Sequence, residues 1–326
     1  MRKFVKNAFY QLVTRLMIAR TGIAFQKNRL QIIAYHGVCL PEDIRFPWVS
    51  PAFATTFAFD LQMSFIKRHM TPLSLKNAVA MMKKGRKLPE RAVAITFDDG
   101  YANNLVYAEP ILKKYEIPAT IFLATDSIDN GTLFHFDRIN CLKYWSESGL
   151  VSDEADKKKL ADLPDYKNVS IYNVEAELSR LWGKFSHMLD DDQKRLLSPM
   201  SWQMAKKSGH FIDYGAHTCG HAILSRISEA DRKKEIENSV GKIREILEYD
   251  DILFSYPNGE KEDFGRFDQE ILKRAGVLAA VTVIRGSNPL NSNLYALRRR
   301  MVSLGHTIEV FEAELGHIRD LIGRDI

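Results

Sequence analysis

The sequence predicts an α/β fold in which parallel strands and helices alternate, either closed into a barrel or left as an open sheet. Two observations lead to this prediction. Short runs rich in β-branched and aromatic residues alternate with amphipathic runs, and about 10 to 15 helical residues separate the strands, as parallel βαβ units require. The 326 residues, 45% of them hydrophobic, also suffice for one large barrel with a full core.

The elements follow one another in a regular order. Runs with the composition of strands lie at residues 30–38, 92–97, 118–124, 210–217, 251–257, 277–283 and 297–304. Runs with helical spacing of apolar residues lie at 57–70, 74–85, 104–117, 230–248 and 267–276. Gly85 and Gly276 provide stop signals after two of these helices, and Pro110 either opens or kinks a third.

The alternation lapses between residues 131 and 209, where charged, mostly helical sequence replaces it. This stretch has no strand pattern and no linker that would mark a separate domain. We therefore interpret it as a helical insertion, at about residues 131–209, in a single barrel domain that covers residues 30–326.

The positive charge of the chain is concentrated in residues 1–29. This segment holds seven basic residues and no acidic one, whereas the remainder has 39 basic and 41 acidic residues. The near-neutral body gives no indication of a nucleic-acid partner. Apolar residues recur at helical spacing within the basic segment, at Val5, Phe9, Leu12 and Leu16. The segment is predicted to be an amphipathic helix that either docks on the body or lies on an anionic membrane face.

The sequence favours a cytoplasmic location. Arg15 interrupts the apolar part of any secretion signal, no convincing cleavage site follows, and no run reaches the roughly 18 apolar residues of a membrane span. The cysteines are an odd number at wide spacing, which argues against a disulfide framework: Cys39, Cys141 and Cys219. We expect an uncleaved protein of a reducing compartment, with residues 1–29 as the contact if it touches the inner membrane face.

Reactive residues gather where the predicted strands end. In parallel α/β folds these carboxyl ends share one edge and carry the active site. The candidates are His36 in "IIAYHGV", Asp98 and Asp99 in "ITFDDG", His217 and His221 in "GAHTCGH", and the turn "SYPNG". Because adjacent residues of a strand point in opposite directions, Asp98 and Asp99 are predicted to face different partners around one centre.

The histidine pair is typical of a metal site. His217 and His221 are four residues apart, so one helical turn would place both imidazoles on the same face. An isolated H-x-x-x-H is equally compatible with two loop or helix histidines that bind no metal. Addition of one carboxylate gives three protein ligands with an open position for water, and the second aspartate is then free to act as a base.

Together the motifs "YHGV", "TFDDGY", "HTCGH" and "SYPNG" resemble those of the polysaccharide deacetylases with NodB homology, carbohydrate esterase family 4. The resemblance covers roughly residues 30–305. It implies a distorted (β/α) barrel and the metal-dependent removal of N-acetyl groups from an amino-sugar glycan. Carried over by motif, Asp98 would be the general base, and the metal ligands would be Asp99, His217 and His221.

The chain departs from the family pattern at three points. The arginine that usually steadies the base is replaced in "SYPN", so Arg299 or its neighbour Arg298 would have to supply that charge from another strand. The D-x-x-x-W motif is absent. The family motif that contains the acid histidine matches this chain only weakly, at His306. By contrast, "YHGV" resembles the permuted arrangement of poly-N-acetylglucosamine deacetylases, and this resemblance favours His36 as the acid.

The implied chemistry is amide hydrolysis. Asp98 would take a proton from water, the backbone N–H of Asn258 and the metal would hold the oxyanion, and His36 would protonate the departing nitrogen. Zn²⁺ is the expected ion, with Co²⁺, Ni²⁺ and Mn²⁺ as alternatives. The partner is an N-acetylated glycan. Because the motif arginine is missing, a catalytically inactive glycan-binding or scaffold protein of the same fold is the alternative.

Overall fold

The structure is a computed structural model, and it describes residue 22 and residues 27–46, 49–163, 165, 167–248 and 250–316. Most of the basic segment predicted at residues 1–29 lies outside the described residues. None of the helices described is both long and apolar enough to cross a membrane.

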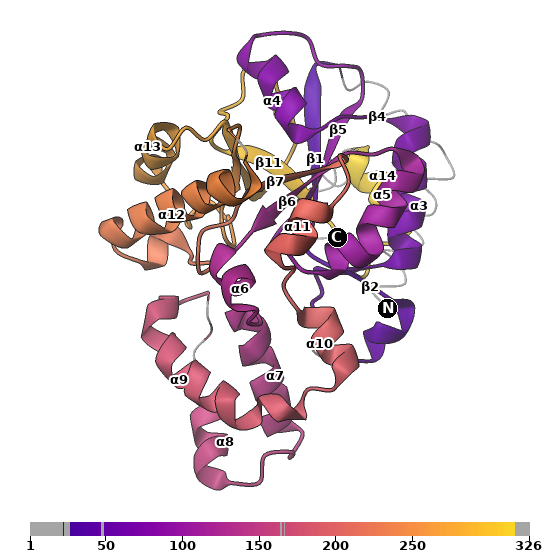
Figure 1. Ribbon diagram of the computed structural model, residues 1–326. Coiled ribbons are helices and arrows are strands. Elements are labelled where there is room, and N and C mark those ends of the chain that lie inside the picture. The colour runs from indigo at the N-terminus through magenta and orange to yellow at the C-terminus, as the bar shows by residue number, and fades with distance from the viewer. Residues whose placement is uncertain are drawn as a thin grey trace.

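Parallel strands close into a barrel, as the sequence predicted (Figure 1). In order around the barrel these strands are β1 (Arg29–Tyr35), β5 (Ala92–Phe97), β6 (Ala119–Leu123), β7 (Ile212–Ala216), β8 (Leu253–Ser255), β9 (Ala279–Arg285) and β11 (Leu297–Met301). Closure depends on β1, which pairs in parallel with β5 on one side and with β11 on the other. The first strand of the barrel therefore borders the last.

Short strands extend this barrel at its margin. β4 (Thr71–Pro72) pairs in parallel with β5, and β10 (Asn288–Pro289) pairs antiparallel with β1. A separate two-stranded sheet joins β2 (Val38–Cys39) and β3 (Ala54–Thr55) just after β1. All six residues of β5 are buried, as expected for a strand that is covered on both faces.

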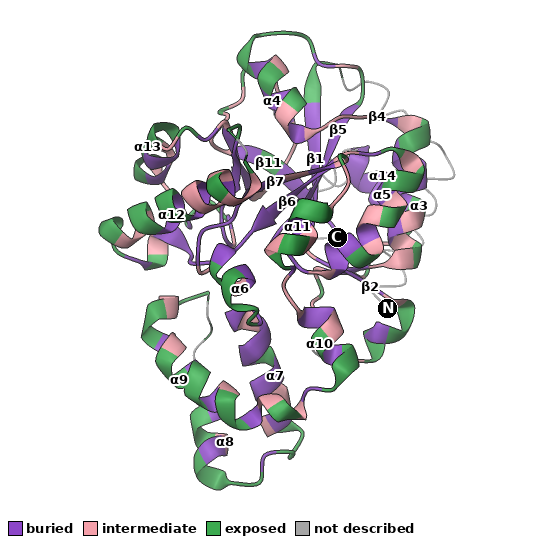
Figure 2. Cartoon of the chain, in the orientation of Figure 1, coloured by how far each residue is buried: buried purple, intermediate pink, exposed green. Residues whose placement is uncertain are grey.

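Helices surround the barrel and turn their apolar faces towards it (Figure 2). They are α3 (Thr56–His69), α4 (Leu75–Lys83), α5 (Glu109–Tyr115), α6 (Thr125–Asn130), α12 (Glu229–Leu247), α13 (Arg266–Arg274) and α14 (Ile308–Leu315), with short turns η1 (Pro41–Arg45) and η4 (Leu224–Arg226). A π-helical stretch, η2 (Asn104–Ala108), leads into α5, and Pro110 lies in the first turn of α5. Pro110 therefore opens this helix, where its missing N–H needs no partner.

A lobe of helices protrudes from the barrel between β6 and β7 (Figure 1). It contains α7 (His135–Glu147), α8 (Glu154–Ala161), α9 (Ile171–Phe185), η3 (Ser186–Met188) and α10 (Asp191–Leu197). The next helix, α11 (Trp202–Lys207), lies back against the barrel, where Ala205 is part of the barrel core. Its apolar core includes Trp145, which stacks on Trp182 with ring centroids 5.8 Å apart. The same apolar cluster continues to Tyr101 and Phe53 beside the barrel, so the lobe is packed onto the barrel rather than tethered to it.

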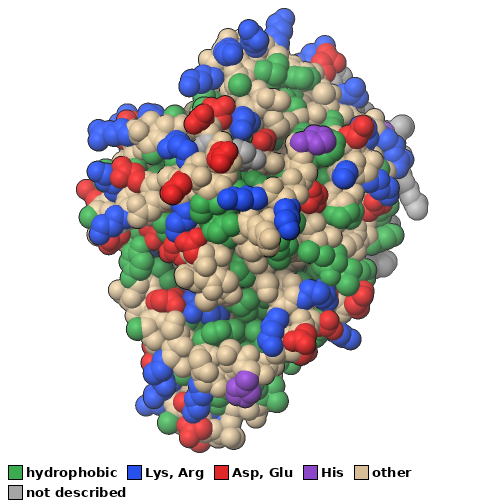
Figure 3. Space-filling model, viewed as in Figure 1, with side chains coloured by type: hydrophobic (Ala, Val, Ile, Leu, Met, Phe, Trp, Pro, Cys, Tyr) green, Lys and Arg blue, Asp and Glu red, His purple; other side chains and the backbone are tan. Residues whose placement is uncertain are grey.

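Charged side chains of both signs lie on the surface, and the cysteines lie inside. On the face drawn in Figure 3, basic and acidic side chains are interspersed. The three cysteines are free and buried: Cys39, Cys141 and Cys219.

Candidate active site

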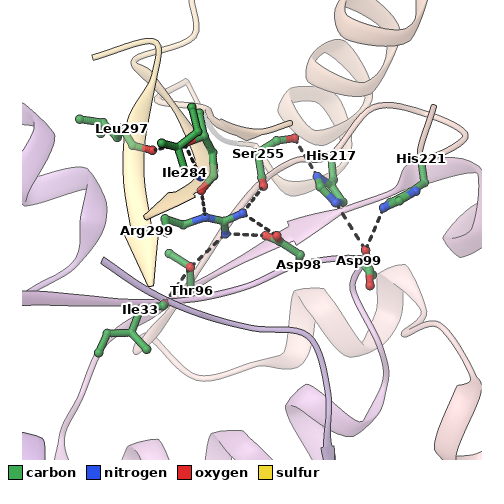
Figure 4. A network of polar contacts seen from close by, with 11 residues as sticks. Ile33, Thr96, Asp98, Asp99, His217, His221, Ser255, Ile284, Leu297 and Arg299 are labelled. Carbon is green, nitrogen blue, oxygen red and sulfur yellow. Dashed lines mark hydrogen bonds and ion pairs between the residues drawn. The ribbon is translucent and has the colours of Figure 1, made fainter. Parts of the chain in front are cut away.

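Polar residues from the carboxyl ends of four barrel strands meet in one buried site (Figure 4). Asp98 and Asp99 follow β5, and His217 follows β7. Ser255 ends β8, and Arg299 lies within β11. Parallel strands carry these residues to the same edge of the barrel, where the sequence predicted the site.

An ion pair between Asp98 and Arg299 lies at the centre of the site. The guanidinium donates from Nη1 to Oδ1 at 2.8 Å and from Nη2 to Oδ2 at 2.6 Å. Both side chains are buried. Burial raises the pKa of Asp98, but the positive charge of Arg299 and further groups outweighs burial, so this pKa lies below its ordinary value. Asp98 is held as an oriented carboxylate.

Every N–H donor of Arg299 has an acceptor. Besides the two bonds to Asp98, its Nε donates to the carbonyl oxygen of Thr282 at 2.7 Å. Its Nη groups also donate to Thr96 Oγ1 at 3.2 Å and to Ser255 Oγ at 3.0 Å. Arg298 points to the exposed side of the same strand. Of the two arginines that the sequence offered, Arg299 is therefore the one that contacts Asp98.

The second aspartate contacts both histidines of the H-x-x-x-H motif. Asp99 Oδ1 lies 3.4 Å from His217 Nε2 and 3.3 Å from His221 Nε2. One ligand atom from each of the three residues lies within 4.8 Å of the others. Asp98 turns to Arg299 while Asp99 turns to the histidines, so the two aspartates face different partners as predicted. The reason is not strand alternation, because β5 ends at Phe97 and Asp99 has a left-handed φ of 73° in the turn that follows.

The chemistry of Asp99, His217 and His221 fits a divalent cation. His217 Nδ1 lies 2.7 Å from the carbonyl oxygen of Ser255, and because a carbonyl accepts only, Nδ1 carries the proton of the neutral ring. The Nε2 lone pair then faces the Asp99 oxygen. That oxygen is buried without a well-formed hydrogen bond among the described residues. Two lone pairs that face each other in a buried site call for a cation between them.

The charge state of Asp99 agrees with this assignment. Burial raises the pKa of this carboxyl, but hydrogen bonds donated by His217 and His221 when their Nε2 atoms carry a proton, together with positive histidine charge, outweigh burial and place the pKa well below its ordinary value. Positive charge on this side of Asp99, from a proton or from a metal ion, therefore keeps the carboxylate ionised. A ligand carboxylate must be ionised to bind metal, so Asp99 is in the form that binding requires.

The segment with the two histidines is a loop and not a helical turn, so that part of the sequence prediction was wrong. Thr218 and His221 have positive φ angles of 60° and 56°. Thr218 Oγ1 accepts the backbone N–H of Ala222 at 3.1 Å, which braces the loop. The loop still presents both imidazoles to Asp99, with each Nε2 within 3.4 Å of the carboxylate.

The two candidate acids lie in different surroundings. His36 directly follows β1, and the backbone N–H of Asp98 donates to the carbonyl oxygen of the preceding residue, Tyr35, at 3.0 Å, so His36 lies beside the two aspartates. Its Nδ1 is buried and has no hydrogen-bond partner among the described residues. His306 precedes α14 and lines a small cavity with Ile33 and the ion pair of Arg300 and Glu314, and its Nδ1 accepts the backbone N–H of Ser303 at 3.3 Å. The geometry favours His36 over His306.

Asn258 lies in a tight turn at the carboxyl end of β8. Its φ is 58°, and its side-chain Nδ2 donates to Asp263 Oδ2 at 2.6 Å. The following Gly259 has φ 66°, and a Cβ there would lie 2.8 Å from the carbonyl oxygen of Tyr256. The turn is therefore fixed in shape, and the role of the Asn258 N–H in holding an oxyanion stays a prediction.

The helical lobe also reaches the site, which the sequence analysis did not foresee. At the start of α7, the rings of His135 and Phe136 lie 5.5 Å and 4.9 Å from that of His221. The next residue, Asp137, accepts a hydrogen bond from the Tyr101 hydroxyl at 2.7 Å. Burial raises the pKa of Asp137 to about 8. The string "FHFD" opening a helix was the available signal, because these polar residues interrupt an otherwise apolar run.

Known proteins resemble this chain over most of the barrel. A family model described as polysaccharide deacetylase matches residues 85–280. The protein named "Putative polysaccharide deacetylase YxkH" of Bacillus subtilis (strain 168) is 24% identical over 289 residues, which cover 87% of this chain and 75% of that protein. The poly-beta-1,6-N-acetyl-D-glucosamine N-deacetylase of Staphylococcus aureus (strain MSSA476) is 37% identical over 108 residues, which cover 32% of this chain and 37% of that protein.

A solved structure has the same fold. The Streptococcus pyogenes deacetylase PplD in complex with acetate matches with a TM-score of 0.62 at 17% identity, over 89% of this chain and 99% of that one. The predicted barrel fold with helical insertion is therefore confirmed, and so is the family to which the motifs pointed.

Proposed function

Because the chain belongs to the polysaccharide deacetylase family, we propose that it hydrolyses N-acetyl groups of an amino-sugar glycan with a divalent metal held by Asp99, His217 and His221. One observation carries the proposal: a carboxylate fixed by Arg299 stands next to a second carboxylate that faces two imidazoles. Adjacent aspartates with opposite partners supply a base and a ligand at one centre, which is what metal-assisted amide hydrolysis needs.

Asp98 is the general base of this proposal. Its pKa lies below the ordinary value, so it is ionised at neutral pH and can accept a proton from water. The two hydrogen bonds from Arg299 fix the carboxylate plane and leave a lone pair on each oxygen for that proton. A metal bound beside it would supply a water of lowered pKa and polarise the acetyl carbonyl.

His36 is the proposed acid. Amine expulsion requires a proton on the nitrogen, since an amide anion is a poor leaving group. His36 follows the end of β1, where Tyr35 accepts the backbone N–H of Asp98, and this position beside the aspartates supports the transfer of a proton from its ring to the sugar nitrogen. The backbone N–H of Asn258, in the fixed turn after β8, is the proposed donor to the oxyanion.

Zn²⁺ is the ion proposed for the site. Two imidazoles and one carboxylate form a three-ligand set that leaves a position for water, which is typical of catalytic zinc. Co²⁺, Ni²⁺ and Mn²⁺ can occupy similar ligands, and metal analysis of the purified protein distinguishes them.

The proposed substrate is a polymer or precursor that contains N-acetylglucosamine. The name of the staphylococcal relative, with its poly-β-1,6-linked substrate, and the position of His36 on the first strand support this class. The inactive alternative was motivated by the missing motif arginine. Arg299 makes the contact that such an arginine would make, so no observation now favours an inactive protein.

We further propose that the enzyme works in the cytoplasm, with residues 1–29 as its contact with the inner membrane face. The support is the seven basic residues without an acid in this segment. Fractionation of the producing cells and sequencing of the protein's N-terminus test the location. Recovery of a processed protein outside the cytoplasm would contradict it.

Acetate release from a panel of β-1,4- and β-1,6-linked N-acetylglucosamine oligomers tests the function. The zinc-loaded chain is expected to release acetate, whereas His217→Ala and His221→Ala are expected to lose both bound metal and activity. Lys233→Ala, an exposed change on α12, serves as the control. Full metal occupancy in both histidine variants would remove the metal assignment.

A further inference from the structure

The loop between His217 and His221 has an intrinsically unfavourable backbone conformation, so other parts of the protein must stabilise it. Thr218 and His221, the first and last of the four residues 218–221, both lie in the left-handed region, which is unfavourable for residues with a side chain and most of all for a β-branched one. Such residues persist where the surroundings fix them. The structure must therefore contain groups that fix this loop.

The carbonyl groups of the loop are held by α6. The backbone N–H of Thr125 donates to the carbonyl oxygen of Thr218 at 3.3 Å, and that of Asp126 donates to the carbonyl oxygen of Cys219 at 2.9 Å. These bonds fix one side of the loop. They leave the N–H groups of the same segment to be satisfied elsewhere.

A single buried carboxylate satisfies these N–H groups. Glu235 Oε2 accepts the backbone N–H of Cys219 at 2.7 Å and that of Gly220 at 3.0 Å. Glu235 is 4% exposed and lies on α12, a helix of 19 residues that packs on the barrel through Ile236 and Val240. The carboxylate thus ties the middle of the histidine loop to a rigid element.

The other oxygen of this carboxylate is bound by the helical lobe. The hydroxyl of Tyr172, in the first turn of α9, donates to Glu235 Oε1. Tyr172 itself is half exposed. One hydrogen-bonded chain therefore runs from the lobe through Glu235 to the two residues that precede His221.

We infer that Glu235 is a positioning residue for the metal site, and that Tyr172 makes the helical lobe part of the support of this site. Glu235 holds the loop so that His217 and His221 face Asp99 before any ion arrives. The inference rests on the proposed metal site. It adds an outer hydrogen-bonded layer that acts through backbone N–H groups rather than through the imidazoles.

Four variants of the full chain test the inference, each stripped of metal and then titrated with Zn²⁺ against a competing chelator. Glu235→Ala removes all three hydrogen bonds, and its Kd for Zn²⁺ is expected to rise by about 10- to 100-fold. Glu235→Gln can offer its amide oxygen to the two N–H groups and its amide nitrogen to Tyr172, so its Kd is expected within about threefold of the original.

Of the remaining two variants, one tests the contribution of the helical lobe and the other is a control on α12. Tyr172→Phe removes one hydrogen bond and is expected to raise the Kd about fivefold. Glu237→Ala changes an exposed glutamate on the same helix and is expected to leave the Kd unchanged. The visible absorption of bound Co²⁺ adds a readout of ligand geometry, which is expected to change in Glu235→Ala and to be kept in Glu235→Gln and Glu237→Ala.

The outcomes are distinguishable. An unchanged Kd and Co²⁺ spectrum in Glu235→Ala would overturn the inference and leave the proposed function intact, whereas a parent chain that binds neither ion would overturn the metal site itself. If circular dichroism shows that Glu235→Ala does not fold, the other variants decide. Loss of zinc affinity in Glu235→Gln comparable to that of a metal-ligand variant, or no change in Tyr172→Phe, would then contradict the inference.

Discussion

Arg299 on β11 and Asp98 after β5 form a two-pronged ion pair although 201 residues separate them in the sequence. The two strands are not hydrogen-bonded to each other, because β1 lies between them in the barrel. The guanidinium also donates to groups on β5, β8 and β9, so it lies inside the barrel. It contacts Asp98 on the side opposite Asp99 (Figure 4).

Replacement of Arg299 by lysine is expected to lower kcat/KM by at least about tenfold, because an ammonium cannot reproduce the forked contact with both oxygens of Asp98. The Arg299 charge holds the pKa of Asp98 down against burial, so a weaker contact raises that pKa. The acid limb of the profile of kcat/KM against pH is therefore expected to move to higher pH. Arg298→Lys, at an exposed position of the same strand, is the control. An acid limb that stays in place would show that Arg299 does not set the ionisation of the base.

Replacement by asparagine is expected to affect rate and metal binding differently at Asp98 and at Asp99. Asp98→Asn should keep the metal and lose at least about a hundredfold in rate, within the range of general base catalysis. Asp99→Asn should lose the metal, because the amide provides a weaker and neutral ligand to the cation between His217 and His221. Metal content by mass spectrometry and acetate release check both. Metal loss in Asp98→Asn with retention in Asp99→Asn would reverse the two roles.

His36→Ala is expected to retain the metal and lose most of its hydrolysis of N-acetylglucosamine oligomers. An aryl acetate has a leaving group that needs little protonation, so its hydrolysis should suffer much less from the same change. His306→Ala is the matched comparison, since that side chain lines a cavity beside α14 that neither aspartate lines. Normal oligomer deacetylation in His36→Ala, with loss in His306→Ala, would assign the acid to the C-terminal histidine.

Asp137→Asn is expected to stabilise the metal-free chain at alkaline pH. Burial raises the pKa of Asp137 from 3.8 to about 8, so the folded chain keeps this proton over a range in which the unfolded chain releases it. Stability is thus lost as pH rises from about 4 to about 8, by up to about 6 kcal/mol for a shift of this size. Asparagine does not titrate, and its oxygen can still accept the Tyr101 hydroxyl.

Urea unfolding at several pH values checks this prediction. The free energies of unfolding of Asp137→Asn and the parent should coincide near pH 4 and diverge towards pH 8, with the variant more stable. Glu147→Gln, at an exposed position of the same helix α7, should follow the parent throughout. A variant that is less stable than the parent at pH 8 would contradict a buried, protonated Asp137.

The sequence predicted the elements of this site that lie at the ends of strands. Asp98, Asp99 and His36 could be placed because a strand that ends in polar residues delivers them to a known edge of a parallel fold. The choice between Arg298 and Arg299 stayed open, since the alternation along a strand says that they face opposite ways but not which of them faces inward.

What the sequence missed depends on contacts between distant segments. A spacing of four residues fits a helical turn as well as a loop, and the loop of His217 and His221 is set by bonds from α6 and from Glu235, which no local pattern reveals. The approach of His135 and Asp137 to the site depends on how the helical lobe packs on the barrel. The spacing of apolar residues predicts helices and strands, but it does not predict how the lobe packs on the barrel.

The position of β1 between β5 and β11 also has a consequence for biosynthesis. Synthesis at about 5 to 20 residues per second would take roughly 10 to 40 s to pass from Asp98 to Arg299, since 201 residues separate them. During this interval Asp98 lacks the positive charge of Arg299. The sheet is also not yet closed, so its edge strands can pair with other chains. Release of the last strand from the ribosome therefore closes the sheet and neutralises the aspartate in one event, so a ribosome stalled before residue 297 would display an aggregation-prone intermediate and no assembled catalytic centre.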